Sequence, residues 1–277
     1  MVFPNYISHF VIPLVIAAGC GTDAVTDKAT NTQSIDLSHW KLTLPVDEDR
    51  DGKADEYVDL ATYQSNSSIK PYLYDGPNGS LVFYCPYTGI TTPNSRYPRT
   101  ELREQLAPGD NNVNWTMEKG GAMVGRLKVA DISKGHRTIV MQIHGRLTKE
   151  QKEKINAPDN DAPPLLKIFF QNNKIRVVRK ILVNEEIEGE AILSKEAWKD
   201  DSDHYFEQEL GNKEFTLMVL ASRGRLEVRL NDVAKVYEDL SMQRWPFDNY
   251  FKAGNYLQST DNNAFAKVEF YSLKVTH

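Results

Sequence analysis

The chain has 277 residues, a formal net charge of −5 and 26% charged residues, which suits one large domain and is too long for a disulfide-stapled mini-protein. Hydrophobic residues make up 40% of it, with 13 Tyr and 11 Phe, and this excludes a disordered chain because enough apolar surface is available to offset the entropy of ordering. The negative charge excludes a globally basic nucleic-acid binder. We therefore expect no nucleic acid partner, and a polyanionic ligand would have to be bound by a local cationic groove.

The N-terminal segment predicts export. Residues 1–19 contain no Asp, Glu, Lys or Arg and hold an apolar run shorter than a bilayer-spanning helix, as a signal peptide does. The run Ala-Ala-Gly directly before Cys20 resembles the cleavage and lipidation site of a bacterial lipoprotein, with a plain secretory signal as the alternative. Residues 20–34 are expected to form a polar tether and residues 35–277 a single domain. The protein would then be secreted or attached through lipidated Cys20 to the bacterial outer membrane, leaving Cys85 as a lone thiol.

Short alternating segments, separated by Gly, Asn, Asp and Pro clusters, predict an all-β sandwich or barrel. Turn residues at Asn172-Asn173 and Arg223-Gly224 predict antiparallel hairpins. Short helices are predicted at Leu60–Gln64, Lys149–Ile155 and Lys195–Asp200, each too brief to organise a domain. The predicted strands are Leu81–Cys85, Met123–Val129, Thr138–His144, Lys167–Phe170, Lys174–Leu182, Phe215–Leu220, Leu226–Leu230, Val233–Tyr237 and Ala266–Val275.

Two loops and the tryptophans leave alternatives open. The segment Arg146–Pro164 is charged and then Pro-rich, which suits either a solvated loop or a lid over a site. Asp47–Asp55 has the carboxylate spacing of a calcium loop, but Val58 stands where such a loop carries a bidentate Glu, so a solvated acidic loop is preferred and a structural calcium is the minority alternative. Buried packing is expected of all four tryptophans rather than stacking on sugars: Trp40, Trp115, Trp198 and Trp245.

Three segments aim unusual polar side chains to one side, because residues two apart in a strand share a face. Any one of them could be an ordinary solvated strand. Together they offer arginines, a lysine, a histidine, a tyrosine and amides, which as neighbouring strands would form a cationic groove suited to an acidic polymer. The faces are Arg99, Glu101, Arg103 and Gln105; then Gln142 and His144, opposite Ile139, Met141 and Ile143; then Lys252, Tyr256 and Gln258, with Gly254 leaving a gap.

These segments carry a family resemblance. RTELRE at 99–104, QIH at 142–144 and YFKAGNYLQ at 250–258 resemble, in order, the three motifs of polysaccharide lyase family 7, the alginate lyases. The opening DLSHWKLTLP at 36–45 is similar to that family's first strand. The resemblance implies a β-jelly-roll sandwich of two antiparallel sheets with a concave substrate groove. It also implies β-elimination on alginate, a polymer of uronic acids, by a monomer that requires no cofactor and no catalytic metal.

The resemblance assigns roles by position. Arg99 and Gln142 would neutralise the uronate carboxylate, so that the charge of the enolate-like transition state is offset. Neutral His144 would remove the C5 proton of guluronate, and Tyr256 would protonate the leaving oxygen and also serve as base for mannuronate. The implied catalytic residues are thus Arg99, Gln142, His144 and Tyr256, and the implied substrate-binding residues are Glu101, Arg103, Lys252 and Gln258.

Finer expectations follow for two positions and for the activity. Glu101 should orient Arg99 or Arg103 by ion pairing, and Ile143 at the centre of QIH is associated in the family with guluronate-containing blocks. The expected activity is endolytic cleavage of alginate. A lyase for another polyuronate, such as glucuronan, is one alternative. A non-catalytic alginate-binding sandwich is another, although binding alone would need neither a base nor an acid.

Overall fold

The computed structural model describes residues 35–277. The predicted signal peptide, lipidated Cys20 and tether therefore lie outside the described residues. Within 35–277, no helix has the length and apolar character needed to cross a bilayer.

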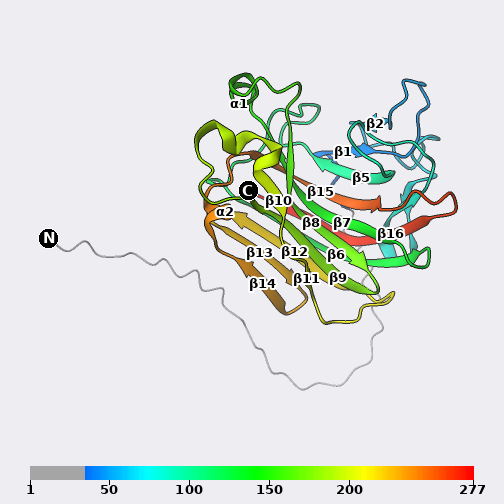
Figure 1. Cartoon of the computed structure of the whole chain (residues 1–277). Coiled ribbons are helices and arrows are strands. Elements are labelled where there is room, and N and C mark those ends of the chain that lie inside the picture. Colours follow the sequence, from blue (N-terminus) through cyan, green and yellow to red (C-terminus); the bar gives the residue numbers. More distant parts are fainter. Residues whose placement is uncertain (1–34) are drawn as a thin grey trace, which may run out of the picture. The chain divides into compact units, whose positions relative to one another are not determined.

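Two antiparallel sheets make up the structure, as the all-β prediction requires (Figure 1). The nine-stranded sheet runs β10 (Trp198–Asp200), β9 (Lys174–Leu182), β8 (Asp161–Gln171), β7 (Arg137–Arg146), β15 (Asp248–Leu257), β5 (Arg99–Glu104), β1 (Trp40–Thr43) and β2 (Glu56–Tyr57), with β11 (His204–Tyr205) also paired to β9. The seven-stranded sheet runs β14 (Val233–Tyr237), β13 (Arg225–Leu230), β12 (Phe215–Ser222), β6 (Gly121–Ile132), β16 (Phe265–Thr276), β4 (Leu81–Pro86) and β3 (Leu73–Asp75). The short helices are α1 (Lys149–Lys154), α2 (Leu240–Gln243) and the 3₁₀ turns η1 (Pro77–Gly79), η2 (Gly189–Leu193) and η3 (Lys195–Ala197).

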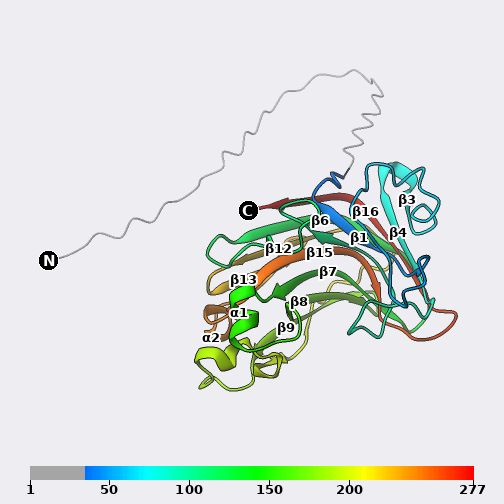
Figure 2. The same cartoon turned by 90° about the horizontal axis from the view of Figure 1, so that it is seen from above.

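The sheets stack face to face and enclose the core (Figure 2). Phe83 of β4 meets Phe270 of β16 edge to face at 5.4 Å between ring centroids, and Trp115 meets Phe251 of β15 at 4.9 Å. All four tryptophans are buried, which confirms the packing prediction, and Cys85 is a buried free thiol.

All nine predicted strands are present, most of them longer than predicted. Both predicted hairpins are confirmed by the antiparallel pairs β8/β9 and β12/β13. Asn172 and Asn173 adopt φ of 51° and 61°, the left-handed pair that a two-residue hairpin turn requires.

Two of the three predicted helices are wrong wholly or in part. Residues 60–64 form hydrogen-bonded turns rather than a helix. The Tyr63 N–H bonds the carbonyl oxygen of Leu60, three residues back, instead of the i−4 carbonyl of an α-helix. The segment 195–200 is helical only to Ala197, because Trp198 is buried and pairs with Leu182 in a sheet. The third helix is confirmed as α1.

The predicted loop Arg146–Pro164 is shorter than expected. β8 begins at Asp161 and so takes in Pro163 and Pro164, leaving 147–160 with α1 inside it. The pairing of β7 with β8 shifts register on both sides of His144, which lies opposite Pro164. Proline has no N–H to donate to a ladder, so irregular pairing is expected at this point.

Candidate active site

The three polar segments lie side by side as β7, β15 and β5. Lys252 of β15 stands opposite Gln142 on one neighbour and Arg103 on the other, and Tyr256 stands opposite Arg99. The proposed adjacency is therefore confirmed.

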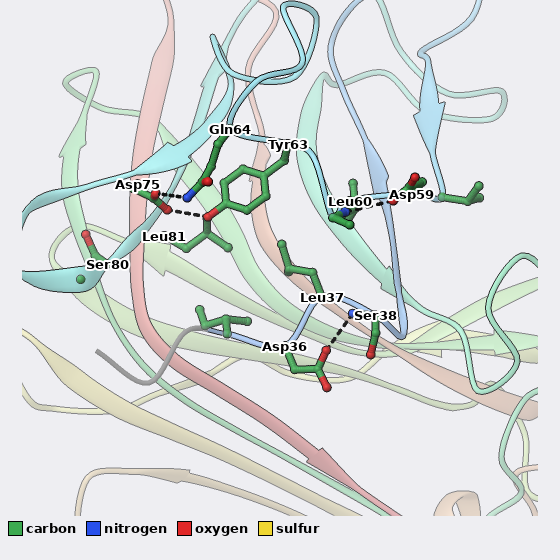
Figure 3. Close-up of a pocket in the computed structure, with 14 residues that line it drawn as sticks. Asp36, Leu37, Ser38, Asp59, Leu60, Tyr63, Gln64, Asp75, Ser80 and Leu81 are labelled. Atoms are coloured by element: carbon green, nitrogen blue, oxygen red, sulfur yellow. Dashed lines mark hydrogen bonds between the residues drawn. The ribbon is translucent and has the colours of Figure 1, made fainter. Parts of the chain in front are cut away.

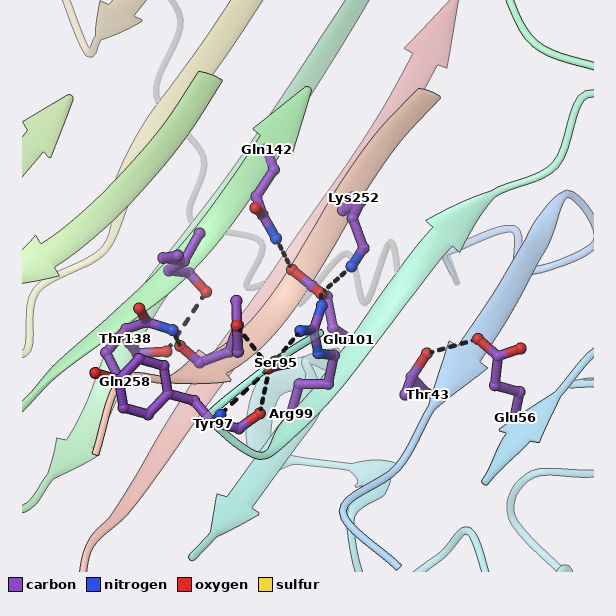
Figure 4. Close-up of polar contacts among 12 residues, drawn as sticks. Thr43, Glu56, Ser95, Tyr97, Arg99, Glu101, Thr138, Gln142, Lys252 and Gln258 are labelled. Atoms are coloured by element: carbon purple, nitrogen blue, oxygen red, sulfur yellow. Dashed lines mark hydrogen bonds and ion pairs between the residues drawn. The ribbon is translucent and has the colours of Figure 1, made fainter. Parts of the chain in front are cut away.

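Glu101 is the centre of the site's polar contacts (Figure 4). Its carboxylate lies 2.5 Å from Lys252 Nζ and 3.1 Å from Arg99 Nη1, and it accepts a hydrogen bond from Gln142 Nε2 at 2.5 Å. The Glu101 side chain is 1% exposed. One buried carboxylate thus ties together residues from all three strands.

The charges in this cluster shift one another. Burial alone would raise the pKa of Glu101, but Lys252 and Arg99 outweigh it and hold that pKa below its usual value. Burial and the neighbouring Arg99 lower the pKa of Lys252 to about 8. At neutral pH two cations and one anion leave a net charge of +1. The site is cationic as predicted, but less so than the strand faces suggest, because Glu101 neutralises one of the cations.

Tyr256 is held at the edge of this cluster. The Arg99 guanidinium lies over its ring, 3.8 Å from the centroid. The Tyr256 hydroxyl is 2.9 Å from Ser95 Oγ, which also accepts a hydrogen bond from Arg99 Nη2 at 3.1 Å. The phenol therefore has a fixed position next to a cation.

His144 is oriented by backbone and aromatic contacts. Its Nδ1 lies 2.9 Å from the Gly145 carbonyl oxygen, and since only a protonated nitrogen can donate there, Nε2 keeps its lone pair. The imidazole stacks on Tyr250 at 5.3 Å and 17°, and Arg103 lies 4.1 Å from the same tyrosine ring. Burial, with Lys252 nearby, lowers the pKa of His144 to about 4. The imidazole is thus neutral at physiological pH, as a general base must be.

Two predicted substrate-binding residues are engaged within the chain. Arg103 donates to the Glu104 and Asn111 carbonyl oxygens and to Asn114 Oδ1, so Glu101 pairs with Arg99 and not with Arg103. Gln258 donates from Nε2 to the Tyr256 carbonyl oxygen at 3.3 Å.

The predicted side of one residue on β7 is wrong. Ile139 was expected to share the core face with Met141 and Ile143, but it packs with Phe169 and Val178 in a separate cluster beside Tyr256. The β7/β8 register shifts between Ile139 and Met141. An extra residue in one strand reverses which face the following side chains occupy, so period-two counting fails there.

Gly254 was expected to leave a gap in the polar face, and that expectation is wrong. A Cβ at this position would lie 2.7 Å from the Thr100 carbonyl oxygen and 3.0 Å from the buried Phe83 ring. Its φ is +137°, a conformation that glycine tolerates and other residues avoid. The adjacent Asn255 side chain is buried and bonds Thr138 Oγ1 and the Phe83 carbonyl oxygen. This bulge therefore serves backbone geometry and links between the sheets.

Sequence reasoning missed two residues of the site. Tyr250 is two positions before Lys252, so period-two counting carried one step back would have found it. Ser95 lies in the loop before β5, and no local pattern predicts its contacts with Tyr256 and Arg99.

Other candidate sites lie elsewhere. A cavity of about 890 Å³ is lined by residues including Asp36, Tyr63, Gln64 and Asp75, where Tyr63 and Gln64 both bond Asp75 (Figure 3). In the acidic loop Asp47–Asp55, for which calcium binding was the minority alternative, carboxylate oxygens of Asp47, Asp49 and Asp55 lie within 4.8 Å of one another. Neither group includes a residue of the three polar strands.

Fold and site together define a β-sandwich protein whose nine-stranded sheet carries a neutral histidine, a tyrosine held against an arginine, and a cluster of donors around one buried carboxylate. The alginate lyase family profile matches residues 35–277, and the chain belongs to this family of polysaccharide lyases, polysaccharide lyase family 7, whose solved members share its jelly-roll fold. An alginate lyase of Klebsiella pneumoniae is 26% identical over 87% of this chain and 89% of its own length. The crystal structure of alginate lyase A1-II' of family 7 superposes with a TM-score of 0.70 and 28% identity, covering 89% of this chain and 97% of that one. A variant of A1-II' in complex with product (GGG) gives a TM-score of 0.71 at 29% identity, covering 89% and 98%.

Proposed function

We propose that this chain cleaves the 1,4-glycosidic bond of alginate by β-elimination. The observation that carries the proposal is the convergence of Arg99, Gln142 and Lys252 on one buried carboxylate, with Tyr256 against the same arginine. The A1-II' complex with product (GGG) supports alginate as the substrate class.

The cluster would neutralise the substrate carboxylate. C5–H of a uronate is weakly acidic because the neighbouring carboxylate is already negative, so fixed donors must stabilise the added charge. Gln142 has a second amide N–H beyond the one donated to Glu101, and Arg99 has further N–H groups. A net charge of +1 in the cluster favours one incoming carboxylate.

The elimination then balances with two side chains. The C5–H bond breaks and the proton passes to Nε2 of His144, the electron pair forms the C4–C5 double bond, and the C4–O4 bond breaks. Tyr256 gives its phenolic proton to O4. For mannuronate, whose C5–H lies on the other face of the ring, Tyr256 would serve as base and acid in turn. These steps use only side-chain charges and proton carriers, so we propose that turnover needs no added metal.

We propose an endolytic enzyme that prefers guluronate-containing blocks. The support for the preference is the Ile143 position between Gln142 and His144, since Ile143 is fully buried and acts only through the placement of its two neighbours. A lyase for another polyuronate such as glucuronan remains the competing function, because the same cluster would bind any uronate carboxylate.

Export is a separate proposal, supported by the apolar N-terminal segment and by Cys20. We propose that the mature protein is secreted or carries lipid on Cys20. Mass spectrometry of the mature N-terminus would test this: cleavage before Cys20 with added lipid mass supports the anchor, and an intact Met1 contradicts export.

The activity test is direct. The protein is incubated with alginate, polyguluronate, polymannuronate and glucuronan without added metal, and the ultraviolet absorbance of the new double bond is followed. Tyr256→Phe and His144→Ala should each lower turnover on polyguluronate at least ~100-fold while leaving binding largely intact. Absorbance on glucuronan alone would favour the competing lyase, and absorbance on none of the polymers would favour a binding protein.

A further inference from the structure

A second cationic position lies on the same face of the nine-stranded sheet, beyond Tyr256. Along β15 the residues opposite β7 follow in the order His144, Gln142 and Ile139, paired with Tyr250, Lys252 and Tyr256. Next along β7 is Arg137, whose carbonyl oxygen accepts the backbone N–H of Gln258 at 3.0 Å. Two residues of strand span about 7 Å, so Arg137 lies beside Tyr256 and on the side away from Lys252.

Arg137 reaches this face because of the β7 bulge. Counting by two from Gln142 and His144 would place it on the core face. The register shift between Ile139 and Met141 reverses the count, and its guanidinium instead lies over the Phe169 ring, 5.8 Å from the centroid. Phe169 is 5% exposed and packs with Ile139 next to Tyr256. It therefore forms a floor under Arg137.

Arg137 differs from the other arginines on the strands around the site. Arg99, Arg103, Arg146, Arg176 and Arg179 each have hydrogen-bond or ion-pair partners within the chain. Among residues 35–277, the Arg137 guanidinium has neither a hydrogen-bond acceptor nor a carboxylate within ion-pair distance, and its Nε is shielded from solvent. Apart from its contact with the Phe169 ring, this partly buried guanidinium has lost hydration without gaining a hydrogen-bond acceptor in return.

We propose that Arg137 binds the carboxylate of a uronate unit next to the one that reacts, which makes it a substrate-positioning residue outside the three motifs. This rests on the proposed function. Alginate carries a carboxylate on every unit, so a polymer whose reacting carboxylate sits at Arg99 and Gln142 presents another beyond Tyr256. Gln258, bonded to Arg137 through the backbone, adds an amide at the same place.

The test compares Arg137→Gln with Arg223→Gln. Arg223 pairs with Glu118 at 3.6 Å, with a 72% exposed side chain, in the β12–β13 turn of the other sheet, so its variant removes the same charge far from the site. Losing one charge-assisted contact should raise KM for alginate about tenfold, with kcat within about twofold of wild type. Arg223→Gln should match wild type in both constants. Thermal unfolding of Arg137→Gln should stay close to that of wild type, since no internal ion pair is lost.

A binding measurement tests Arg137 independently of whether the protein cleaves alginate. Equilibrium binding of alginate is measured for Tyr256→Phe with and without Arg137→Gln, and carboxyl-reduced alginate is the neutral probe. A loss of about tenfold on alginate but not on the neutral polymer supports the inference even if the wild type proves unable to cleave. Binding within about twofold of the parent variant, an equal loss in Arg223→Gln, or a wild type that does not bind alginate would overturn it.

Discussion

Glu101→Gln tests whether the buried carboxylate holds the site together. The change keeps the shape of the side chain but removes the charge that Arg99 and Lys252 share at 3.1 and 2.5 Å. Two buried cations then face each other without an anion, and breaking a buried pair of this kind costs about 3–5 kcal/mol. For a domain of this size about 2–4 °C is lost per kcal/mol, so Tm should fall by about 6–20 °C.

The site should also lose activity. The amide that replaces the carboxylate keeps one oxygen and gains an NH2, so Oε1 facing Gln142 and Oε2 facing Arg99 and Lys252 can no longer both accept. Misplacement of the donor that loses its acceptor by about 1 Å can cost about 100-fold in rate. Lys252, whose pKa is already lowered to about 8 by burial and Arg99, would lose its proton more readily without Glu101. We therefore expect kcat/KM on polyguluronate to fall about 100-fold at neutral pH.

Glu227→Gln is the matched control. Glu227 also bridges two arginines, Arg225 at 2.8 Å and Arg229 at 2.7 Å, but on the other sheet, and both arginine side chains are 43% exposed. Such exposed pairs contribute about 0–1 kcal/mol each, so losing both should lower Tm by at most about 8 °C, and activity should persist. If Glu101→Gln changes Tm and kcat/KM no more than this control does, the central role of Glu101 is wrong.

Unfolding in acid is a second measurement of how much Glu101 contributes to stability. The folded-state pKa of Glu101 lies below its ordinary value, so its contribution to stability is complete above the unfolded value near ~4.3. That contribution is lost as pH falls through the lower folded value. Wild type should therefore lose stability more steeply than Glu101→Gln as pH drops below about 4, and parallel curves would contradict the linkage.

Three further changes follow from the geometry. Because the pKa of His144 is about 4, the acid limb of the kcat/KM profile on polyguluronate should lie near that pH. An acid limb near ~6.5 would contradict the assignment of the base. On the alkaline side, loss of the Lys252 proton above about pH 8 should weaken substrate binding. Gly254→Ala should lower the free energy of unfolding in urea by about 2–6 kcal/mol through backbone strain and overpacking. The control Gly135→Ala, whose new Cβ meets open space, should lose about 1–2 kcal/mol. Equal losses of unfolding free energy in the two variants would show that the close contact at Gly254 is not the cause. Tyr250→Ala should lower kcat on polyguluronate about tenfold by freeing the imidazole, whereas Tyr250→Phe keeps the stacking ring and should retain most activity, so equal kcat values for the two variants would refute the stacking role.

The sequence predicted the faces correctly wherever the strands are regular. In β5 the alternation of Arg99, Glu101 and Arg103 against Thr100 and Leu102 persists because pairing with β15 runs without a register shift. Period-two counting needs only such continuity. It failed on β7 and around Gly254, where bulges reset the count, and these bulges depend on backbone geometry and on the pairing of β7 with β8 and β15.

The ion-pair partners of the site residues were less predictable from the sequence than the strand face on which each residue lies. Counting by two places Glu101 between Arg99 and Arg103, and either could have been its ion-pair partner. The spatial order of the strands decides, because Lys252 and Gln142 reach Glu101 from β15 and β7 while Arg103 is taken by Asn111 and Asn114. No local pattern contains that order.

The positive charge that is free to bind a polyanion does not lie on the motif residues. Read one residue at a time, the motifs suggest a groove lined with free cations, but within residues 35–277 the motif cations Arg99 and Lys252 already share an anion. Counting partners among the described residues, the guanidinium on these strands that has neither a hydrogen-bond acceptor nor an ion-pair carboxylate belongs to Arg137, a residue outside every motif. It faces the substrate side because a bulge displaced it from the core side. An irregularity that defeats sequence counting thus also creates the cationic position that the motifs do not contain, so charge-removing variants at Arg137 and at the motif residues should separate binding of the neighbouring unit from the elimination itself.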